Sequence, residues 1–182
     1  MLELYWAYQN YKGLMKFVEG LLKPFIKGKI KTVTFSSLIK DWKKTKPEML
    51  DEVFRKEVRS KIIEPTFVID YPEIVMPLAK LKPENPELTE SFQLIVNGSE
   101  IVKGFSELND PIVQRAQMER QEKEFRAGNK EASRLDEDFL EALEYGMPPA
   151  AGFGLGIDRL ATLVTKSHSV KEIIAFPTLR PK

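Results

Sequence analysis

The chain has 182 residues, of which 42% are hydrophobic and 30% are charged, and its 28 basic and 27 acidic residues leave a formal net charge of +1. Such a composition is typical of a folded globular domain, and the balanced charge gives no electrostatic signal for nucleic-acid binding. With no cysteine and one histidine, disulfides, thiolate zinc sites and multi-histidine metal centres are excluded, so any catalytic metal is a hard cation such as magnesium. The sequence has no membrane-spanning apolar run and no signal-peptide pattern, so we expect a cytoplasmic protein that does not associate with membranes.

The N-terminal third is predicted to be largely helical. Apolar residues recur every three or four positions, as in an amphipathic helix, at Tyr5, Tyr8, Tyr11, Met15, Val18 and Leu22. A lysine-rich stretch follows, and a second helical pattern covers residues 47–61. We interpret residues 27–61 as a surface insertion that carries a helix or two.

The middle of the chain changes to β structure. Residues 63–72 (IEPTFVIDYP) predict a strand, and the proline-punctuated residues 77–88 predict a loop. Asn97-Gly98 then lies between two β-rich runs and predicts a hairpin with a type I′ turn, because both central positions need a positive φ. This register pairs Val96 with Ser99, Ile95 with Glu100, and Gln93 with Val102.

Helices are predicted for most of the C-terminal third. Asp110 and Pro111 suit the N-cap and first position of a charged, exposed helix that ends near Gly128. A further helix is predicted over residues 136–145. Near the end of the chain, Ser169 and Glu172 fit a capping box before a short helix.

The segment GFGLGIDR, residues 152–159, is the strongest candidate for a ligand site. Its three glycines allow a backbone to lie against a flat ligand, and Arg159 at the start of a helix can hold a triphosphate with its guanidinium group. The same spacing also suits a strand and a helix that pack too closely for side chains. Glycine spacing alone does not decide between these alternatives.

This segment strongly resembles motif 3 of class II aminoacyl-tRNA synthetases. The lysyl-tRNA synthetase family is the one indicated by four further segments, MLELYWAYQNYKGLM, EPTFVIDYP, GFSELND and IIAFPTLRPK. The resemblance is loosest over residues 27–61, where the family usually has a longer insertion. It implies an α+β fold, an antiparallel sheet with flanking helices, in which residues 1–182 form the C-terminal part of the catalytic domain and residues 152–165 form motif 3.

The resemblance also implies an activity, ATP-dependent formation of lysyl-adenylate and transfer of lysine to tRNA(Lys). Arg159 would hold the γ-phosphate of ATP, Gly154 and Gly156 would line the nucleotide site, and Glu100 would bind the nucleotide through magnesium. Glu100 and Arg159 are therefore the expected catalytic residues, and Glu100 and Gln93 the expected metal ligands. The expected lysine-binding residues are Glu3, Tyr5, Lys103, Phe105 and Glu107.

The sequence departs from the family in two site residues. Gln93 replaces a second magnesium-binding glutamate, which predicts fewer or weaker magnesium ions. Lys103 replaces an asparagine near the substrate carboxylate, where it either pairs with that carboxylate or crowds the pocket. Because the expected site uses residues from both faces of a regular hairpin, we predict a bulge or bend between Glu100 and Phe105.

The resemblance places an anticodon-binding domain, motif 1 and most of motif 2 outside this chain. We therefore expect the isolated chain not to form lysyl-adenylate at a useful rate. The resemblance implies a homodimer for full-length members of the family, and a homodimer of this chain alone is not expected. Two alternatives remain, a paralogue that attaches lysine to a translation elongation factor and a non-catalytic binding module derived from a synthetase.

Overall fold

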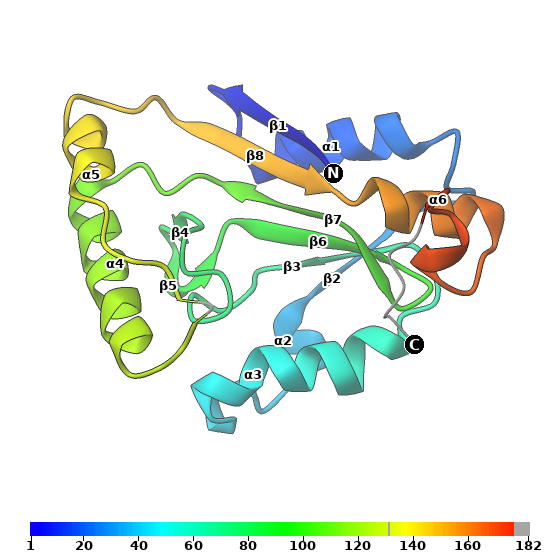
Figure 1. The fold of residues 1–182 in the computed structure, drawn as a ribbon, viewed down its shortest axis with the longest axis horizontal. Helices are drawn as coiled ribbons and strands as arrows, with labels where there is room; N and C mark the ends of the chain where they lie inside the picture. The colour runs from blue at the N-terminus through cyan, green and yellow to red at the C-terminus, as the bar shows by residue number, and fades with distance from the viewer. Residues whose placement is uncertain (131, 177–182) are drawn as a thin grey trace.

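A computed structural model describes residues 1–130 and 132–176. Its main feature is a six-stranded sheet in the order β1-β8-β7-β6-β3-β2, antiparallel throughout except for the parallel pair β2 and β3 (Figure 1). The strands of this sheet are β1 (Leu2–Ala7), β2 (Lys31–Thr34), β3 (Thr66–Ile69), β6 (Ser91–Val96), β7 (Ser99–Ser106) and β8 (Ala150–Leu155). With helices flanking the sheet, the predicted α+β fold is confirmed.

The α-helices lie on both sides and at both ends of the sheet (Figure 1). They are α1 (Tyr11–Leu22), α2 (Phe35–Leu38), α3 (Pro47–Val53), α4 (Pro111–Arg126), α5 (Glu137–Glu144) and α6 (Ile157–Thr165). Short helical turns are η1 (Trp42–Lys44), η2 (Phe54–Val58), η3 (Arg59–Lys61) and η4 (Val170–Glu172).

The N-terminal helix begins later than its apolar spacing suggests. The prediction that Tyr5 and Tyr8 belong to this helix is wrong, because β1 occupies residues 2–7 and Tyr8 has a φ of 61°. Asn10 starts the helix, since its side chain accepts hydrogen bonds from the backbone N–H groups of Lys12 and Gly13. Backbone pairing of β1 with β8 makes this segment a strand, although its tyrosines recur with a helical period.

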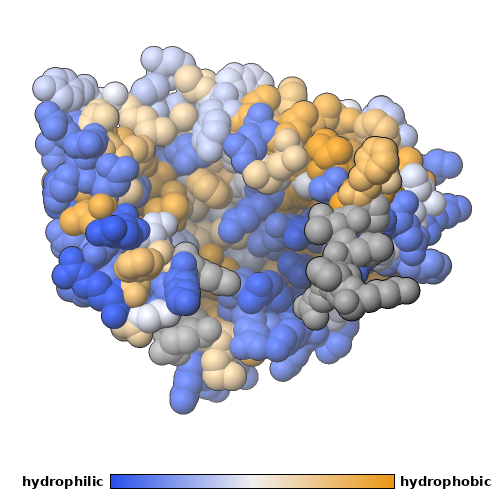
Figure 2. Space-filling view, in the orientation of Figure 1, coloured by the Kyte–Doolittle hydropathy of each residue, from blue (hydrophilic) through white to orange (hydrophobic). Residues whose placement is uncertain are grey.

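One face of the sheet is covered by α1. Buried residues of this helix, among them Leu14 and Val18, pack in one core cluster with Leu94, Val102 and Phe153 from the strands. The exposed apolar side chains of this region extend to the surface of β1 and α1, where Figure 2 shows hydrophobic atoms gathered above the sheet. By contrast, the surface over α4 is mostly hydrophilic in the same view.

Part of the opposite face is covered by α2, α3 and η2. Phe35, Phe54 and Tyr71 form a ring cluster with centroid separations of 5.1 to 5.4 Å, and they pack with Ile95 of β6. The interpretation of residues 27–61 as a surface insertion is therefore wrong in part, because this segment contributes core residues and also the strand β2. The helical prediction for residues 47–61 is confirmed by α3, η2 and η3.

The Asn97-Gly98 hairpin forms as predicted. Asn97 and Gly98 have φ values of 50° and 72°, and their N–H groups donate to the carbonyl oxygens of Ile63 and Ile62 at 2.9 and 2.8 Å. Val96 pairs with Ser99 and Ile95 pairs with Glu100, but the predicted pairing of Gln93 with Val102 is wrong. The register shifts at this point, so Leu94 pairs with Val102, Gln93 pairs with Lys103, and Ile101 is the extra residue of a bulge. The predicted bulge between Glu100 and Phe105 is confirmed.

The helices after the hairpin begin where the sequence predicts, but one of them is more buried than predicted. Asp110 and Asp136 cap α4 and α5 through their side chains. However, α4 buries three glutamines on the face that packs inward, Gln114, Gln117 and Gln121.

Two smaller predictions are wrong. Residues 77–88 were predicted to form a loop, but they contribute the two-stranded ladder of β4 (Leu81–Lys82) and β5 (Asn85–Thr89). The capping box of Ser169 and Glu172 does not form, because the Glu172 carboxylate accepts the N–H of His168 and the Ser169 side chain makes no cap hydrogen bond. The last six residues of the IIAFPTLRPK segment lie outside the described residues.

Candidate active site

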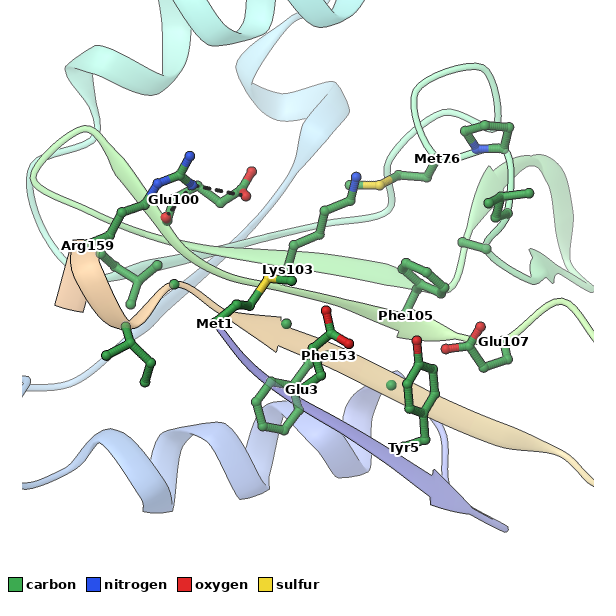
Figure 3. Close-up of a pocket in the computed structure, with 18 of the residues that line it drawn as sticks. Met1, Glu3, Tyr5, Met76, Glu100, Lys103, Phe105, Glu107, Phe153 and Arg159 are labelled. Carbon is green, nitrogen blue, oxygen red and sulfur yellow. Dashed lines mark hydrogen bonds and ion pairs between the residues drawn. The ribbon is translucent and has the colours of Figure 1, made fainter. Parts of the chain in front are cut away.

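A cavity of about 790 Å³ lies on the face of the sheet that α1 does not cover. Strands β1, β7 and β8, the start of α6 and the loop at residues 76–79 line it (Figure 3). Nine of the ten predicted site residues are part of its wall, namely Glu3, Tyr5, Glu100, Lys103, Phe105, Glu107, Gly154, Gly156 and Arg159. The structure therefore brings all the predicted site residues except Gln93 together on one surface.

The strand register explains why these residues share a face. Gly152 of β8 pairs with Phe105 on one side and Tyr5 on the other, and Gly154 pairs with Lys103 and Glu3 in the same way. Side chains of β1 and β7 thus lie on either side of Gly152 and Gly154, which we call the glycine strip because these positions carry no side chain. The bulge at Ile101 brings Glu100 onto the same face, although it precedes Lys103 by an odd number of residues.

Gly152 leaves room that a larger residue would remove. A Cβ atom at this position would lie 2.7 Å from Oε1 of Glu107 and 2.8 Å from Cδ1 of Tyr5. Both distances are too short for ordinary contacts. The glycine therefore permits Glu107 and Tyr5 to approach each other across β8.

One end of the cavity is acidic. Glu3, Tyr5 and Glu107 lie together there, with their oxygen atoms turned into the cavity (Figure 3). Burial raises the pKa of the Glu107 carboxyl to about 7, well above its ordinary value of 4.5. A cation bound beside Glu107 would stabilise its charged form, so this end suits an amine.

The other end carries the arginine of the GFGLGIDR segment. Arg159 donates from Nη1 to the backbone oxygen of Glu100 at 2.8 Å and to Oε1 of the same residue at 3.3 Å (Figure 3). Helix α6 starts beside it with Gly156 at the N-cap and no side-chain cap, so the positive end of the helix faces the cavity. Lys103 rises from β7 between the two ends (Figure 3).

The two predicted metal ligands are not brought together at the cavity wall. Gln93 is 5% exposed, does not line the cavity, and its Oε1 has no hydrogen-bond partner among the described residues. The Glu100 carboxylate already faces Arg159 and lies 4.0 Å from Nη1 of Arg59. No group of three or more histidine, aspartate or glutamate residues in the described part of the chain could hold a metal ion. Because magnesium usually binds through one or two carboxylates together with substrate phosphates and water, Glu100 fits an ion that would enter with a nucleotide.

Three residues near the site were not anticipated. Gln121 of α4 and Met76 line the cavity, and Arg59 approaches Glu100 from η3. The spacing of the α4 glutamines at three and four residues was a usable signal for a buried polar face. The position of Arg59 gave no such signal, because its contact with Glu100 joins segments far apart in the sequence.

Comparisons with known proteins show which family the chain resembles in sequence. The lysine–tRNA ligase of Moorella thermoacetica is 53% identical over 135 residues, which cover 74% of this chain and 28% of that protein. That of Azobacteroides pseudotrichonymphae is 52% identical over 135 residues, 74% of this chain and 27% of that protein. The Bacillus subtilis enzyme is 35% identical over 227 residues, 100% of this chain and 46% of that protein.

The chain spans less than half the length of each of these relatives. The match to the Bacillus subtilis enzyme extends over 227 residues, so that relative carries segments that the 182 residues of this chain lack. In the described part of the chain, no helix has both the length and the apolar character needed to cross a membrane. The family model for class II tRNA synthetases (D, K and N) matches residues 1–180, and the chain belongs to that family.

Proposed function

We propose that this chain forms the lysine- and ATP-binding part of a lysine–tRNA ligase. The observation that carries the proposal is the separation of charge along one cavity, with Glu3, Tyr5 and Glu107 at one end and Arg159 at the other. Lysine has an ammonium group at the end of its side chain and a carboxylate at its backbone. A substrate of this shape can place its amine at the acidic end and its carboxylate toward the arginine.

The acidic end would select the amine. Two carboxylates compensate a buried ammonium group, whereas a neutral side chain would leave them unpaired. Phe105 of β7 is half-buried between Lys103 and Glu107 along the chain, and it would pack on the aliphatic part of the substrate. Lys103 lies where it can pair with the substrate carboxylate, and this pairing is the alternative that the open cavity favours over crowding.

The arginine end would hold the phosphates of ATP. Arg159 can bind a phosphate through its guanidinium fork, and the N-terminus of α6 adds backbone N–H groups and a positive dipole end. Gly154 and Gly156 would let the nucleotide lie against the backbone. Magnesium would enter as part of the ATP substrate, bound to its phosphates, and Glu100 is the acidic residue nearest to Arg159.

The reaction follows from this placement. An oxygen of the lysine carboxylate forms a bond to the α-phosphorus of ATP, the bond from that phosphorus to the pyrophosphate oxygen breaks, and pyrophosphate leaves. Because a carboxylate has no proton to lose, no general base is needed. A ribose hydroxyl of tRNA(Lys) then attacks the carbonyl carbon of lysyl-adenylate and AMP leaves. The residues of this chain contribute by orienting the two substrates and by balancing charge. Binding of tRNA(Lys) and a cytoplasmic location stay predictions for this chain, and a homodimer is a prediction for full-length members of the family alone.

Thermal unfolding of the chain with added ligands tests the proposal. Lysine should raise the unfolding temperature and ornithine should raise it less, because its shorter side chain does not reach both Glu107 and the carboxylate subsite. A ligand at a hundred times its dissociation constant adds about 2.7 kcal/mol of stability, which is easily measured. Equal stabilisation by lysine, ornithine and norleucine would contradict the assignment of the acidic end.

A further inference from the structure

Gln93 and Lys103 lie opposite each other in the middle of the sheet, below the cavity and in its wall. They pair across β6 and β7, and residues that lie opposite each other place their side chains on the same face of a sheet. The amide oxygen of Gln93 is buried and has no hydrogen-bond partner among the described residues. Within that part of the chain, the Lys103 ammonium makes no hydrogen bond or ion pair either. An acceptor and a cationic donor, both without partners, therefore lie on neighbouring strands.

Lys103 also lies within reach of the acidic end of the cavity. Lys103 and Glu3 both pair with Gly154, from opposite sides, so their Cα atoms are about 10 Å apart. Because Gly154 places no side chain between them, the flexible stems of Lys103 and Glu3 can bridge this distance. Such an ion pair would put the ammonium group of the chain itself where the proposed function places the ammonium group of the substrate.

The structure shows Lys103 in a different orientation. Its side chain extends toward Met76 and away from Glu3 (Figure 3). In the sheet, β6 lies next to β7 on the side opposite to β8 and β1, so this orientation takes Lys103 toward the strand that carries Gln93. Met76 is buried, and its thioether is only a weak acceptor. The last torsion of a glutamine side chain is broad, so the amide of Gln93 can turn its oxygen toward the ammonium group.

A bound amino acid would make this contact more important. In the ligand-free chain Lys103 is exposed, so water can solvate its ammonium group. A substrate in the cavity displaces water, and an ammonium group that loses its water needs polar partners. Because the group has three donors, it can donate to Gln93 and to a substrate carboxylate at the same time. Gln93 would then be the fixed partner, and the substrate would supply the other.

We propose that Gln93 is a positioning residue for Lys103. Its amide oxygen holds the Lys103 ammonium over β6, where that group binds the carboxylate of the substrate and stays away from Glu3. The acidic end is then left open for the side-chain ammonium of the substrate. This inference rests on the proposed function, because it assumes that Glu3 belongs to an amine subsite. The pair of Gln93 and Lys103 thereby selects ligands that carry a carboxylate as well as an amine.

Calorimetric titration with lysine and with cadaverine, which is lysine without its carboxylate, tests the inference. The wild-type chain should bind lysine more tightly than cadaverine. In Gln93→Leu the released Lys103 should compete for Glu3, so the affinities for both ligands should fall about tenfold, as expected for the loss of a hydrogen bond to a charged group.

A second substitution separates this competition from damage to the fold. Lys103→Met, added to Gln93→Leu, removes the competing ammonium group. The affinity for cadaverine should therefore return at least to the wild-type level. The affinity for lysine should stay below the wild-type level, because the substrate carboxylate has lost its partner.

Gln93→Glu and Tyr71→Phe are the matched controls. Gln93→Glu keeps an oxygen acceptor opposite Lys103 and should retain the preference for lysine over cadaverine. Tyr71 packs with Val68, the residue opposite Gln93 on β3, and its hydroxyl is also buried without a partner among the described residues, so it is a competing donor for Gln93. Tyr71→Phe should leave the binding of both ligands unchanged, and thermal unfolding shows whether each variant is folded.

Three results would overturn the inference. In the first, Gln93→Leu binds both ligands as the wild type does. In the second, Lys103→Met does not restore cadaverine binding to Gln93→Leu, which indicates a structural role for Gln93. In the third, Tyr71→Phe reproduces the effect of Gln93→Leu, which makes the Tyr71 hydroxyl the partner of Gln93.

Failure of the proposed function gives a different pattern. If neither the wild-type chain nor Lys103→Met binds lysine or cadaverine, the acidic end is not an amine subsite and both proposals are wrong. If Lys103→Met binds cadaverine and the wild-type chain does not, Lys103 already occupies the acidic end. That result would support the amine subsite and overturn the role of Gln93.

Discussion

Replacing Gly152 with alanine tests whether the acidic end of the cavity depends on the bare backbone beneath it. The added Cβ would lie 2.7 Å from Oε1 of Glu107 and 2.8 Å from Cδ1 of Tyr5, so both side chains must move away from β8. Overpacking of this kind costs about 1 to 3 kcal/mol. Because the two displaced groups are the proposed partners of the lysine ammonium, we expect lysine affinity to fall about tenfold or more.

Calorimetric titration with lysine measures the effect, and thermal unfolding reports on the fold. Gly20→Ala is the control, because a Cβ at this position in α1 meets nothing within 4 Å and should leave lysine binding unchanged. If Gly152→Ala folds and binds lysine as the wild type does, then Glu107 and Tyr5 do not form the amine subsite, and our reasoning about the glycine strip is wrong.

Three further predictions concern charge, packing and capping. Glu107 has a pKa raised to about 7, so between its ordinary value of 4.5 and 7 the folded chain holds more protons than the unfolded chain, and stability should fall as the pH rises through this range. After allowance for partial exposure, the free energy of unfolding should differ by about 1 to 2 kcal/mol between denaturant titrations at pH 5 and pH 8. Glu107→Gln should remove this difference. Phe54→Ala should lower the free energy of unfolding by about 3 to 5 kcal/mol because the ring is fully buried, whereas Phe25→Ala, at an exposed position, should cost far less. Asp110→Ala should cost about 1 kcal/mol in the same assay, because its carboxylate accepts two backbone N–H groups at the start of α4, and an unchanged midpoint would argue against this cap.

The sequence predicted local features best where a single residue dictates the backbone. Asn97-Gly98 determined the turn, and Asp110 determined the start of α4, because positive φ and helix capping are local properties. The bulge at Ile101 was predicted by a different argument, since the expected site residues on β7 could share a face only if the alternation of side chains broke between them.

Features that depend on distant parts of the chain were harder to predict. The tyrosines of β1 happen to recur with a helical period, and only the pairing of β1 with β8 makes that segment a strand. Phe35 and Phe54 are separated by lysine-rich sequence that resembles a surface segment, yet they pack together on Tyr71. Arg59 belongs to the same class, because its approach to Glu100 joins segments that are distant in sequence.

The docking of the hairpin turn on Ile62 and Ile63 also bears on how the chain tolerates changes in length. Two backbone hydrogen bonds anchor the polypeptide at this point, directly after the helical segment and directly before β3. Residues added or removed in the exposed stretch around residues 40–46 would change the segment upstream of the anchor, while the anchor fixes where the chain re-enters the sheet. We therefore expect the length of that stretch to vary without a change in the backbone geometry around Glu100.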